Sequence, residues 1–384
     1  MKHKRALMRA GSVLALLAAG IPSHASEGYK LRQPPVGAFG GEIAAQTDNP
    51  GFFGTIALSS TRIDRVADEN GNDIQLAARS VPLPSGALTK NQIPDGSYNL
   101  LVPAGSIAFH QDQNQVNLMA GYLTESGYGD GRIAFAVNLP LIRQSRTFVP
   151  NQAAGTLSPL PPAALPAPLR GALGALADAA NTQVRAGVVG VAASQNADVS
   201  GPGDTELSAV WVRQQERLKL AAGVSLFVPT GAYDKARGPN PGFGKFYTVR
   251  PGVAVSYALT PKHSDDSWDS GVTVAGRVSF GFNTRNTDTD YRSGNFVYTE
   301  AAIAKTSGAW GCGMNLLSIQ QVSDDRGSGA PAGGFRYRNS GIGPFLAYKL
   351  PGKEAGFNLQ YARNFGSRNA LVANTLQLRF IKAW

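Results

Sequence analysis

Apolar side chains recur at every second position in many segments of this chain, each long enough to cross a membrane as a strand. Between residues 272 and 283, valines and phenylalanines hold one face, while Thr273, Arg277, Ser279 and Asn283 hold the other. Successive side chains of a β-strand point to opposite faces, so this period predicts strands with one apolar face and one polar face. The same alternation runs through residues 133–141, 218–228, 249–259 and 357–364.

A soluble sandwich would show the same alternation, and the connections between the segments separate the two folds. Short links, such as 306–309 and 351–353, alternate with long polar links, such as 230–246, 284–292 and 324–336. Outer-membrane barrels sort their connections in this way, because one rim faces the periplasm and the other faces the exterior. We therefore predict an all-β fold, a transmembrane antiparallel up-and-down β-barrel with long external loops.

The alternation of short and long links also gives the number of strands. It gives 12 strands, an even number that places both chain ends on the periplasmic side, with a last external link at 366–370. The strand-like segment 98–110 could add strands or form a hairpin inside the first external loop, so 14 strands is the alternative. The predicted strands lie near residues 52–63, 115–125, 131–144, 204–215, 217–229, 247–259, 269–283, 293–305, 310–322, 338–350, 355–364 and 372–384.

Two of the predicted external connections are much longer than the others. The first covers residues 66–114, and the second, 145–203, passes from a Pro-rich piece at 159–168 into a helix-compatible stretch at 169–193. Loops of this length are usually functional or flexible rather than incidental. The helical stretch would either cap or enter the pore or lie over the external rim, and the sequence leaves both arrangements open.

The N-terminus has the three parts of a secretory signal. Basic residues at 2, 4, 5 and 9 precede an apolar stretch at 10–21 and a small-residue site at 23–25. The apolar stretch is shorter than the roughly 20 residues that a membrane-spanning helix needs. Residues 1–25 are therefore expected to be a signal peptide cleaved after Ala25, and residues 26–384 an exported protein of the outer membrane of a Gram-negative bacterium.

Composition excludes several functions. Lysine and arginine number 36 against 26 aspartate and glutamate, but they are dispersed and form no stripe suited to nucleic acid. The single cysteine, Cys312, rules out an internal disulfide, and the two histidines beyond the signal, His110 and His263, make no zinc motif. The acidic residues of the predicted loops, at 68–73, 288–290 and 324–325, are better explained as turn residues than as cation ligands. We expect no catalytic residue, no metal and no cofactor.

Polar residues on the inner face of the predicted strands are the candidates for a lining of the solute path. Such side chains would set the charge preference of a lumen. The alternative is that they fill a small barrel with a hydrogen-bonded network and leave no open path. The candidates are Arg250, Arg277, Asn283, Asn358, Gln360, Gln377 and Arg379.

The final strand carries a second pattern. Leu376, Leu378, Phe380 and Trp384 share one face and resemble the C-terminal signal that the outer-membrane barrel assembly machinery recognises. Lys382 departs from that signal at a position that is usually apolar or aromatic. A lysine near the membrane interface can extend its ammonium group to the lipid headgroups, so the pattern is weakened but kept.

Several different short motifs follow one another along most of the chain after the signal. Each motif is weak by itself, but the order in which they occur is specific. They lie at residues 50–53 (PGFF), 203–207 (GDTEL), 227–234 (FVPTGAYD), 282–284 (FNT), 288–294 (DTDYRSG), 320–325 (QQVSDD) and 365–369 (FGSRN). In these motifs the chain resembles the transporter-like outer-membrane family named for the meta-pathway of phenol degradation. The resemblance implies a barrel concerned with passage of aromatic or other hydrophobic compounds.

We therefore expect a monomeric outer-membrane channel or facilitator for passive uptake of small hydrophobic or aromatic solutes, embedded among outer-membrane lipids and lipopolysaccharide. One alternative is a structural or adhesive barrel that acts through its external loops. A barrel enzyme that modifies outer-leaflet lipids is the other, and it would need a serine paired with a histidine near the outer rim, for which His110 is the candidate.

Overall fold

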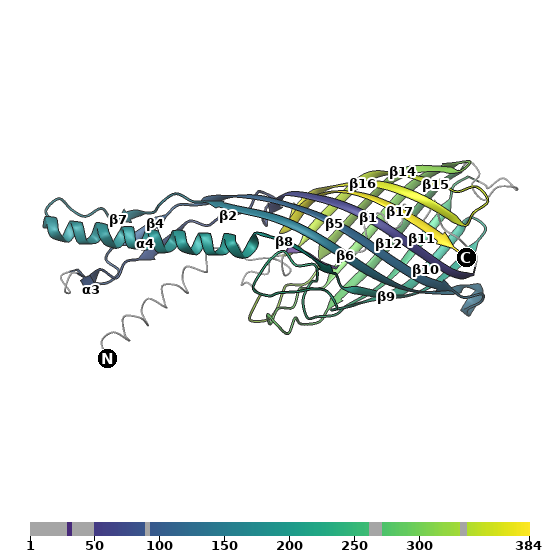
Figure 1. Cartoon of the computed structure of the whole chain (residues 1–384), viewed down its shortest axis with the longest axis horizontal. Coiled ribbons are helices and arrows are strands. Elements are labelled where there is room, and N and C mark those ends of the chain that lie inside the picture. Colours follow the sequence, from purple (N-terminus) through teal and green to yellow (C-terminus); the bar gives the residue numbers. More distant parts are fainter. Residues whose placement is uncertain (1–28, 33–49, 89–92, 261–270, 331–335) are drawn as a thin grey trace. The chain divides into compact units, whose positions relative to one another are not determined.

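Figure 1 shows a computed structural model of the chain as a ribbon. Contacts divide the chain into two compact units. No helix among the described residues is long and apolar enough to cross a membrane. The structure describes residues 29–32, 50–88, 93–260, 271–330 and 336–384.

The first unit, the barrel unit, lies within residues 23–72, 110–146 and 197–384. Its sheet runs from β5 through β1 and β17 to β6, and β6 pairs with β5, so the ring closes. Closure pairs the backbone groups of every strand with a neighbour, as a lipid surround requires. The predicted count of 12 is confirmed by this closed antiparallel barrel, and β2 and β8 are two additional strands of the same sheet.

The strands of the closed ring match the predicted segments in order. They are β1 (Gly51–Ala67), β5 (Gly105–Leu123), β6 (Arg132–Asn151), β9 (Thr205–Gln215), β10 (Leu218–Val228), β11 (Thr248–Ala258), β12 (Gly271–Asn283), β13 (Phe296–Ser307), β14 (Trp310–Gln321), β15 (Arg338–Lys349), β16 (Ala355–Arg368) and β17 (Ala370–Ala383).

The period-two alternation of the sequence corresponds to the outer and inner faces of the barrel. On β16, Phe357, Leu359 and Tyr361 are exposed, whereas Asn358 and Gln360 between them are almost fully buried. Apolar side chains therefore point outward and polar ones inward. This is the reverse of a soluble protein, and it suits a sheet that lipid surrounds.

The connections sort onto two rims, as predicted. The short-link rim carries the links 216–217, 308–309 and 350–354, and the long-loop rim carries the loops 229–247, 284–295 and 322–337. The link predicted at 366–370 is the exception. Since β16 runs to Arg368 and β17 begins at Ala370, only Asn369 remains between them, at φ 47°. Asparagine tolerates this left-handed conformation, so the turn can be tight.

Of the strands that extend beyond their predicted limits, β5 and β6 extend furthest. β5 begins at Gly105 and β6 ends at Asn151, so each continues into a segment predicted as an external loop. The added part of β5 covers residues 105–114, and within it residues 111–114 (QDQN) are polar on both faces, which hides the alternation. At the other end of the predicted loop 145–203, β8 (Ala197–Pro202) pairs antiparallel with β6.

The second unit, the loop unit, is formed by the middle parts of the two longest connections, residues 73–109 and 147–196. The helix-compatible stretch forms α4 (Ala167–Gln195). β3 (Arg79–Pro82), β4 (Asn99–Val102) and β7 (Thr156–Ser158) make a three-stranded antiparallel sheet, with α3 (Ser85–Leu88) nearby in sequence and β2 (Gln75–Leu76) paired to the start of β5. The segment 98–110 therefore supplies β4 and the beginning of β5 and adds no strand to the ring.

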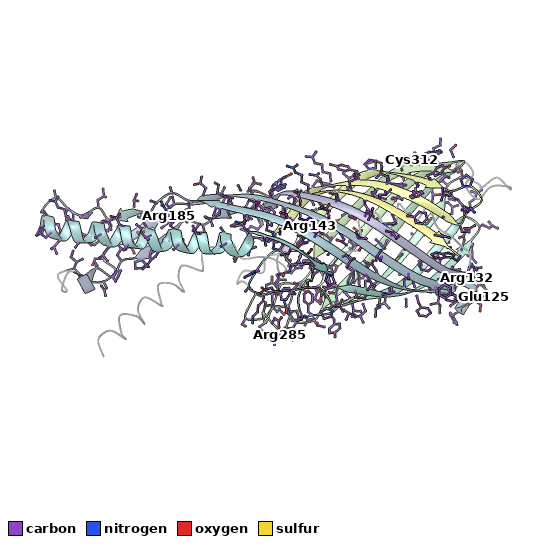
Figure 2. The ribbon with its side chains drawn as sticks, in the orientation of Figure 1. Glu125, Arg132, Arg143, Arg185, Arg285 and Cys312 are labelled. Atoms are coloured by element: carbon purple, nitrogen blue, oxygen red, sulfur yellow. The ribbon has the colours of Figure 1, made fainter. Side chains whose placement is uncertain are left out.

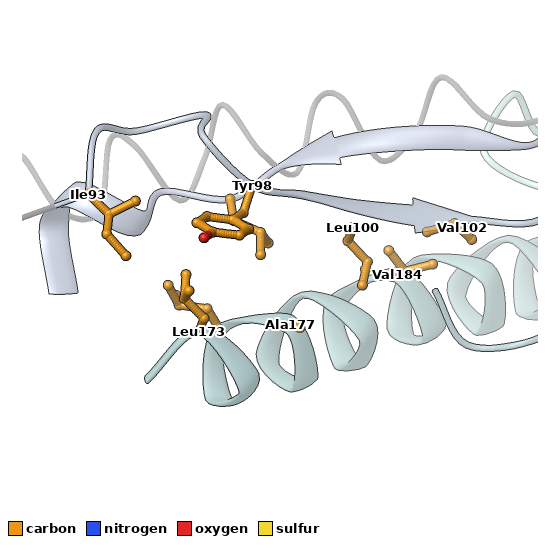
Figure 3. Packing of buried hydrophobic residues seen from close by; sticks show 9 residues of the cluster. Ile93, Tyr98, Leu100, Val102, Leu173, Ala177 and Val184 are labelled. Atoms are coloured by element: carbon orange, nitrogen blue, oxygen red, sulfur yellow. The ribbon is translucent and has the colours of Figure 1, made fainter. Parts of the chain in front are cut away.

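The core of the loop unit lies between α4 and this small sheet (Figure 3). Side chains from β4 and from one face of the helix meet there, and the fully buried Leu100 and Leu173 belong to it. The cluster consists of Leu83, Ile93, Tyr98, Leu100, Val102, Leu173, Leu176, Ala177 and Val184.

Replacing Leu173 with alanine should loosen the loop unit selectively. The side chain is 0% exposed, and a buried Leu→Ala change typically costs about 2–5 kcal/mol. Hydrogen exchange followed by mass spectrometry is expected to show faster exchange in α4 and β4, with the barrel strands unchanged. Leu160→Ala is the control, because Leu160 is 81% exposed. Equal protection of α4 in the two variants would contradict the assigned core.

Candidate functional site

Four of the seven predicted lumen residues meet on two neighbouring strands. Asn358 of β16 lies opposite Arg379 of β17, and Gln360 lies opposite Gln377. Residues directly opposite in an antiparallel pair share a face of the sheet. All four side chains are buried, and they point inward. The structure thus brings these four together as one polar patch on the inner wall.

The patch continues across β1 onto β5. Ser59 of β1 lies opposite Gln377 on one side and opposite Gln115 of β5 on the other. The amide of Gln377 donates to Ser59 Oγ at 2.9 Å, and Arg379 Nη2 donates to Gln377 Oε1 at 2.8 Å. We call this surface the amide wall; it consists of Ser59, Gln113, Gln115, Asn117, Gln144, Asn358, Gln360, Gln377 and Arg379.

Side-chain amides on β5 and β6 form a hydrogen-bonded ladder within the amide wall. Gln144 donates to Gln113 at 2.6 Å, Gln113 donates to Gln115 at 3.1 Å, and Gln115 donates to Asn117 at 2.9 Å. The two ends, Gln144 Oε1 and Asn117 Nδ2, are buried without a hydrogen-bond partner. A buried polar group left unpaired costs about 1–3 kcal/mol, so both ends favour a bound hydroxyl or water.

The sequence did not single out this ladder. The signal was present in the alternating amides of Gln111, Gln113, Gln115 and Asn117. It was missed because the polar residues between them removed the apolar face that marks a strand, and residues 111–114 were assigned to a loop.

The other three predicted residues lie on β11 and β12, away from the amide wall. Arg250 Nη2 lies 2.6 Å from Glu206 Oε1, and Arg277 Nη2 lies 2.5 Å from Glu300 Oε2. Asn283 accepts a hydrogen bond from Thr248 at 2.7 Å. Arg250 is therefore held in a buried ion pair, and Arg277 is partly accessible but paired with a fully covered carboxylate.

The carboxylates of these pairs also escaped the sequence analysis. Glu300 lies within the apolar run 296–304 and is fully covered, and Tyr298 Oη donates to it at 3.1 Å. Glu300 lies two residues after Tyr298, so both side chains point to the inner face of the barrel. This spacing is the signal that could have identified Glu300 from the sequence. Pairing carboxylates with Arg250 and Arg277 required knowledge of the strand register.

A short N-terminal segment, residues 29–32, contacts the inner face of the barrel. Leu31 is buried in an apolar group that comes mainly from β13 and β14. We call this group the lumen cluster; it contains Leu31, Phe296, Tyr298, Leu317, Ile319, Tyr337 and Ala370. Nothing in the alternation or the motifs marks residues 29–32, so the sequence analysis did not foresee this contact.

Arg32 anchors the same segment on the other side. Its Nη2 lies 2.6 Å from Asp204 Oδ2, its Nη1 donates to the Phe246 carbonyl at 2.7 Å, and both partners of the ion pair are buried. The guanidinium also lies 4.0 Å from the centre of the Phe246 ring. Burial lowers the pKa of Arg32, and the Asp204 carboxylate opposes that fall. Because Leu31 and Arg32 contact different strands, the segment narrows the lumen.

Of the predicted assembly residues, Leu376, Leu378 and Phe380 lie on β17, and Trp384 directly follows it. Leu376, Leu378 and Trp384 are exposed, and the Phe380 ring packs 4.9 Å from that of Phe357. The ammonium of Lys382 lies 5.0 Å from the Trp384 ring. Recognition of these residues by the assembly machinery stays a prediction.

The sequence offered two further candidates for chemistry, the histidines His110 and His263. His110 lies between Asp64 and Asp112, at 2.8 and 2.9 Å, and all three side chains are accessible. His263 lies outside the described residues. In the part of the chain that the structure describes, no three His, Cys, Asp or Glu side chains are grouped to hold a metal ion.

Comparison with solved structures identifies the fold. An outer-membrane channel from Pseudomonas putida F1 is similar to this chain with a TM-score of 0.58 and 13% identity, covering 92% of this chain and all of that one. The transport unit of the autotransporter AIDA-I from Escherichia coli gives 0.43 and 9%, covering 97% and 98%. The CymD monoaromatic hydrocarbon channel gives 0.38 and 11%, covering 96% and 98%.

Comparison of the sequence itself identifies the family. No curated protein sequence matches the chain. A family model described as "Putative MetA-pathway of phenol degradation" matches residues 104–380, which is most of the barrel and the loop unit. The chain therefore belongs to this family of the phenol-degradation MetA pathway.

Proposed function

We propose that this protein is an outer-membrane channel that admits small hydrophobic or aromatic solutes by passive diffusion through the barrel. The observation that carries the proposal is a two-sided lumen. The amide wall lies on β16, β17, β1, β5 and β6, and the lumen cluster lies mainly on β13 and β14. An aromatic solute would place its polar substituent against the amides, and its ring would reach the lumen cluster only where Leu31, which fills that cluster, is displaced.

The ion pairs of the lumen support an uncharged solute. Arg32, Arg250 and Arg277 are each paired with a carboxylate, so the charges of these three pairs cancel, and Arg379 of the amide wall is a further cation on the inner face. The segment at residues 29–32 restricts the free cross-section and favours small solutes. The family membership and the fold shared with a known outer-membrane channel support the same role.

The remaining features of the proposal concern export and surroundings. We propose that residues 1–25 are removed after Ala25 and that residues 26–384 act as a monomer in contact with outer-membrane lipids and lipopolysaccharide. The outward face of Leu376, Leu378, Phe380 and Trp384 would serve recognition by the barrel assembly machinery. In this role the protein catalyses no reaction and needs no metal or cofactor.

Planar-bilayer recording of the purified protein tests the channel role. We expect a steady ion current that millimolar phenol interrupts reversibly, since a solute within the lumen blocks ions, and that arabinose leaves unchanged. A protein that never conducts, or whose current ignores every aromatic solute tried, would refute the role. Removing residues 147–196 distinguishes the adhesive alternative, which predicts lost binding to a surface partner and an unchanged current.

Replacing Gln115 with leucine should weaken the interaction with hydroxylated solutes. The change breaks the amide ladder in its middle and removes hydrogen bonds worth about 0.5–1.5 kcal/mol each. The dwell time of phenol in the pore is expected to fall several-fold, and that of toluene is expected to stay the same. Asn114→Leu, on the exposed outer face of the same strand, is the matched control. Equal losses for both solutes would show that the ladder only supports the wall.

A further inference from the structure

Two arginines lie directly opposite each other where two loops of the long-loop rim meet. The backbone N–H of Arg292 donates to the carbonyl of Arg326 at 2.8 Å, and the reverse bond measures 2.9 Å. Side chains of such an antiparallel pair share a face, with Cβ atoms about 4.5–5.5 Å apart, and like charges in this position destabilise the pairing. An anion between the two guanidinium groups would remove that cost.

The two arginines line one cavity. Its volume is about 550 Å³, and Asn283, Thr284, Arg285 and Gly327 complete the lining. Arg285, which Figure 2 shows among the loops, forms an ion pair with Asp290. Across the described ranges, no carboxylate pairs with the side chain of Arg292 or Arg326. The cavity is therefore lined by two guanidinium groups that no carboxylate compensates and by a third, that of Arg285, which is paired with Asp290.

The loops that present these arginines are held in place by their own hydrogen bonds. Asn286 is fully buried, and its backbone N–H donates to the Tyr291 carbonyl at 2.7 Å. Asp325 accepts a hydrogen bond from the Gly294 N–H at 2.7 Å and another from the Tyr291 hydroxyl. A site whose frame is formed before binding loses less free energy on ordering when the ligand arrives.

We propose that this cavity is a binding site for a phosphomonoester group. A carboxylate is satisfied by one guanidinium fork, whereas a phosphate monoester presents three acceptor oxygens and a charge of about −1.5 to −2 at pH 7. That charge matches the two uncompensated arginines, and the third oxygen suits the guanidinium of Arg285. The inference does not depend on the channel role.

Two sources could supply this group, a phosphate of lipopolysaccharide or a soluble phosphate ester. A second opposed pair favours the lipid source. Arg338 of β15 lies directly opposite Arg368 of β16, and both are exposed. In the residues that the structure describes, neither has an ion-pair partner. Basic side chains on the outward side of a barrel near its long-loop rim lie where lipid phosphates are found.

Binding of purified full-length protein in detergent tests the site. Three probes are used: lipopolysaccharide, the same lipopolysaccharide after enzymatic removal of its phosphates, and inorganic phosphate. We expect native lipopolysaccharide to bind about tenfold or more tightly than the dephosphorylated form, because charge-assisted hydrogen bonds are lost with the phosphate. Arg326→Gln should remove this difference, because among the described residues the Arg326 side chain has no hydrogen bond or ion pair to lose. Arg292→Gln should act alike, although it also removes the hydrogen bond from Arg292 Nε to the Asn283 carbonyl.

The control and the remaining outcomes decide between the sources. Arg217→Gln, on the short-link rim, should leave all three affinities unchanged. Binding of inorganic phosphate that Arg326→Gln abolishes, with equal affinity for the two lipopolysaccharides, would keep the site and assign it to a soluble ester. Arg326→Gln protein that binds native lipopolysaccharide and inorganic phosphate as tightly as the unaltered protein would overturn the proposal.

Discussion

Arg32→Ala is expected to raise the single-channel conductance several-fold. Arg32 holds residues 29–32 in the lumen through its ion pair with Asp204 and its hydrogen bonds to Phe246 and Thr248. Removing one partner of a buried ion pair costs about 3–5 kcal/mol, because the remaining charge stays buried without compensation. The segment then loses its anchor, and the restriction that it imposes on the lumen is released.

Conductance in planar bilayers, measured at fixed salt and voltage, checks this prediction. Leu31→Ala should act in the same direction, since it removes the side chain that fills the lumen cluster. Arg143→Ala is the matched control, because Arg143 forms an exposed ion pair with Asp198 on the outer face. If the Arg32→Ala protein folds and conducts like the control, residues 29–32 do not restrict the path.

Glu300→Gln is expected to shift the ion selectivity of the channel toward anions and to lower its thermal stability. The carboxylate is fully covered, and it compensates the guanidinium of Arg277, which remains partly accessible from the lumen. Without Glu300, Arg277 presents an unpaired positive charge to passing ions. Loss of a buried partner costs about 3–5 kcal/mol, so the unfolding transition should move as well.

The reversal potential in a KCl gradient measures the selectivity, and thermal unfolding in detergent measures the stability. Arg277→Glu should move the reversal potential in the opposite direction, toward cations, because two carboxylates then adjoin. Glu354→Gln is the control, as Glu354 is exposed on the short-link rim. A reversal potential that neither Glu300→Gln nor Arg277→Glu alters would remove this pair from the ion path.

The alternation of the sequence predicted the barrel because its cause is local. Neighbouring side chains of a strand point to opposite faces, and lipid requires one of those faces to be apolar. The alternation predicted no strand where both faces are polar, as in QDQN at residues 111–114, which belong to β5. It also treated 366–370 as a loop, because Gly366 and Asn369 are turn residues and a one-residue turn has no length to detect.

The inner face was predicted residue by residue, but its organisation was not. Four polar residues that alternate with apolar ones were predicted to point inward, and the structure confirms that they are buried: Asn358, Gln360, Gln377 and Arg379. They lie beside Gln115 of β5 only because β1 pairs with β17, the first strand of the barrel with the last. No local pattern specifies such a pairing.

By itself, the sequence determined the strands, their inward and outward faces and the two kinds of rim, since each of these follows from neighbouring residues. Only the tertiary structure decided which inward side chains meet. The register of the strand pairs forms the amide wall and pairs Arg250 with Glu206 and Arg277 with Glu300, and the folding of two loops brings Arg292 opposite Arg326. Contacts between residues far apart in the chain arise from that register, and a local period carries no information about it.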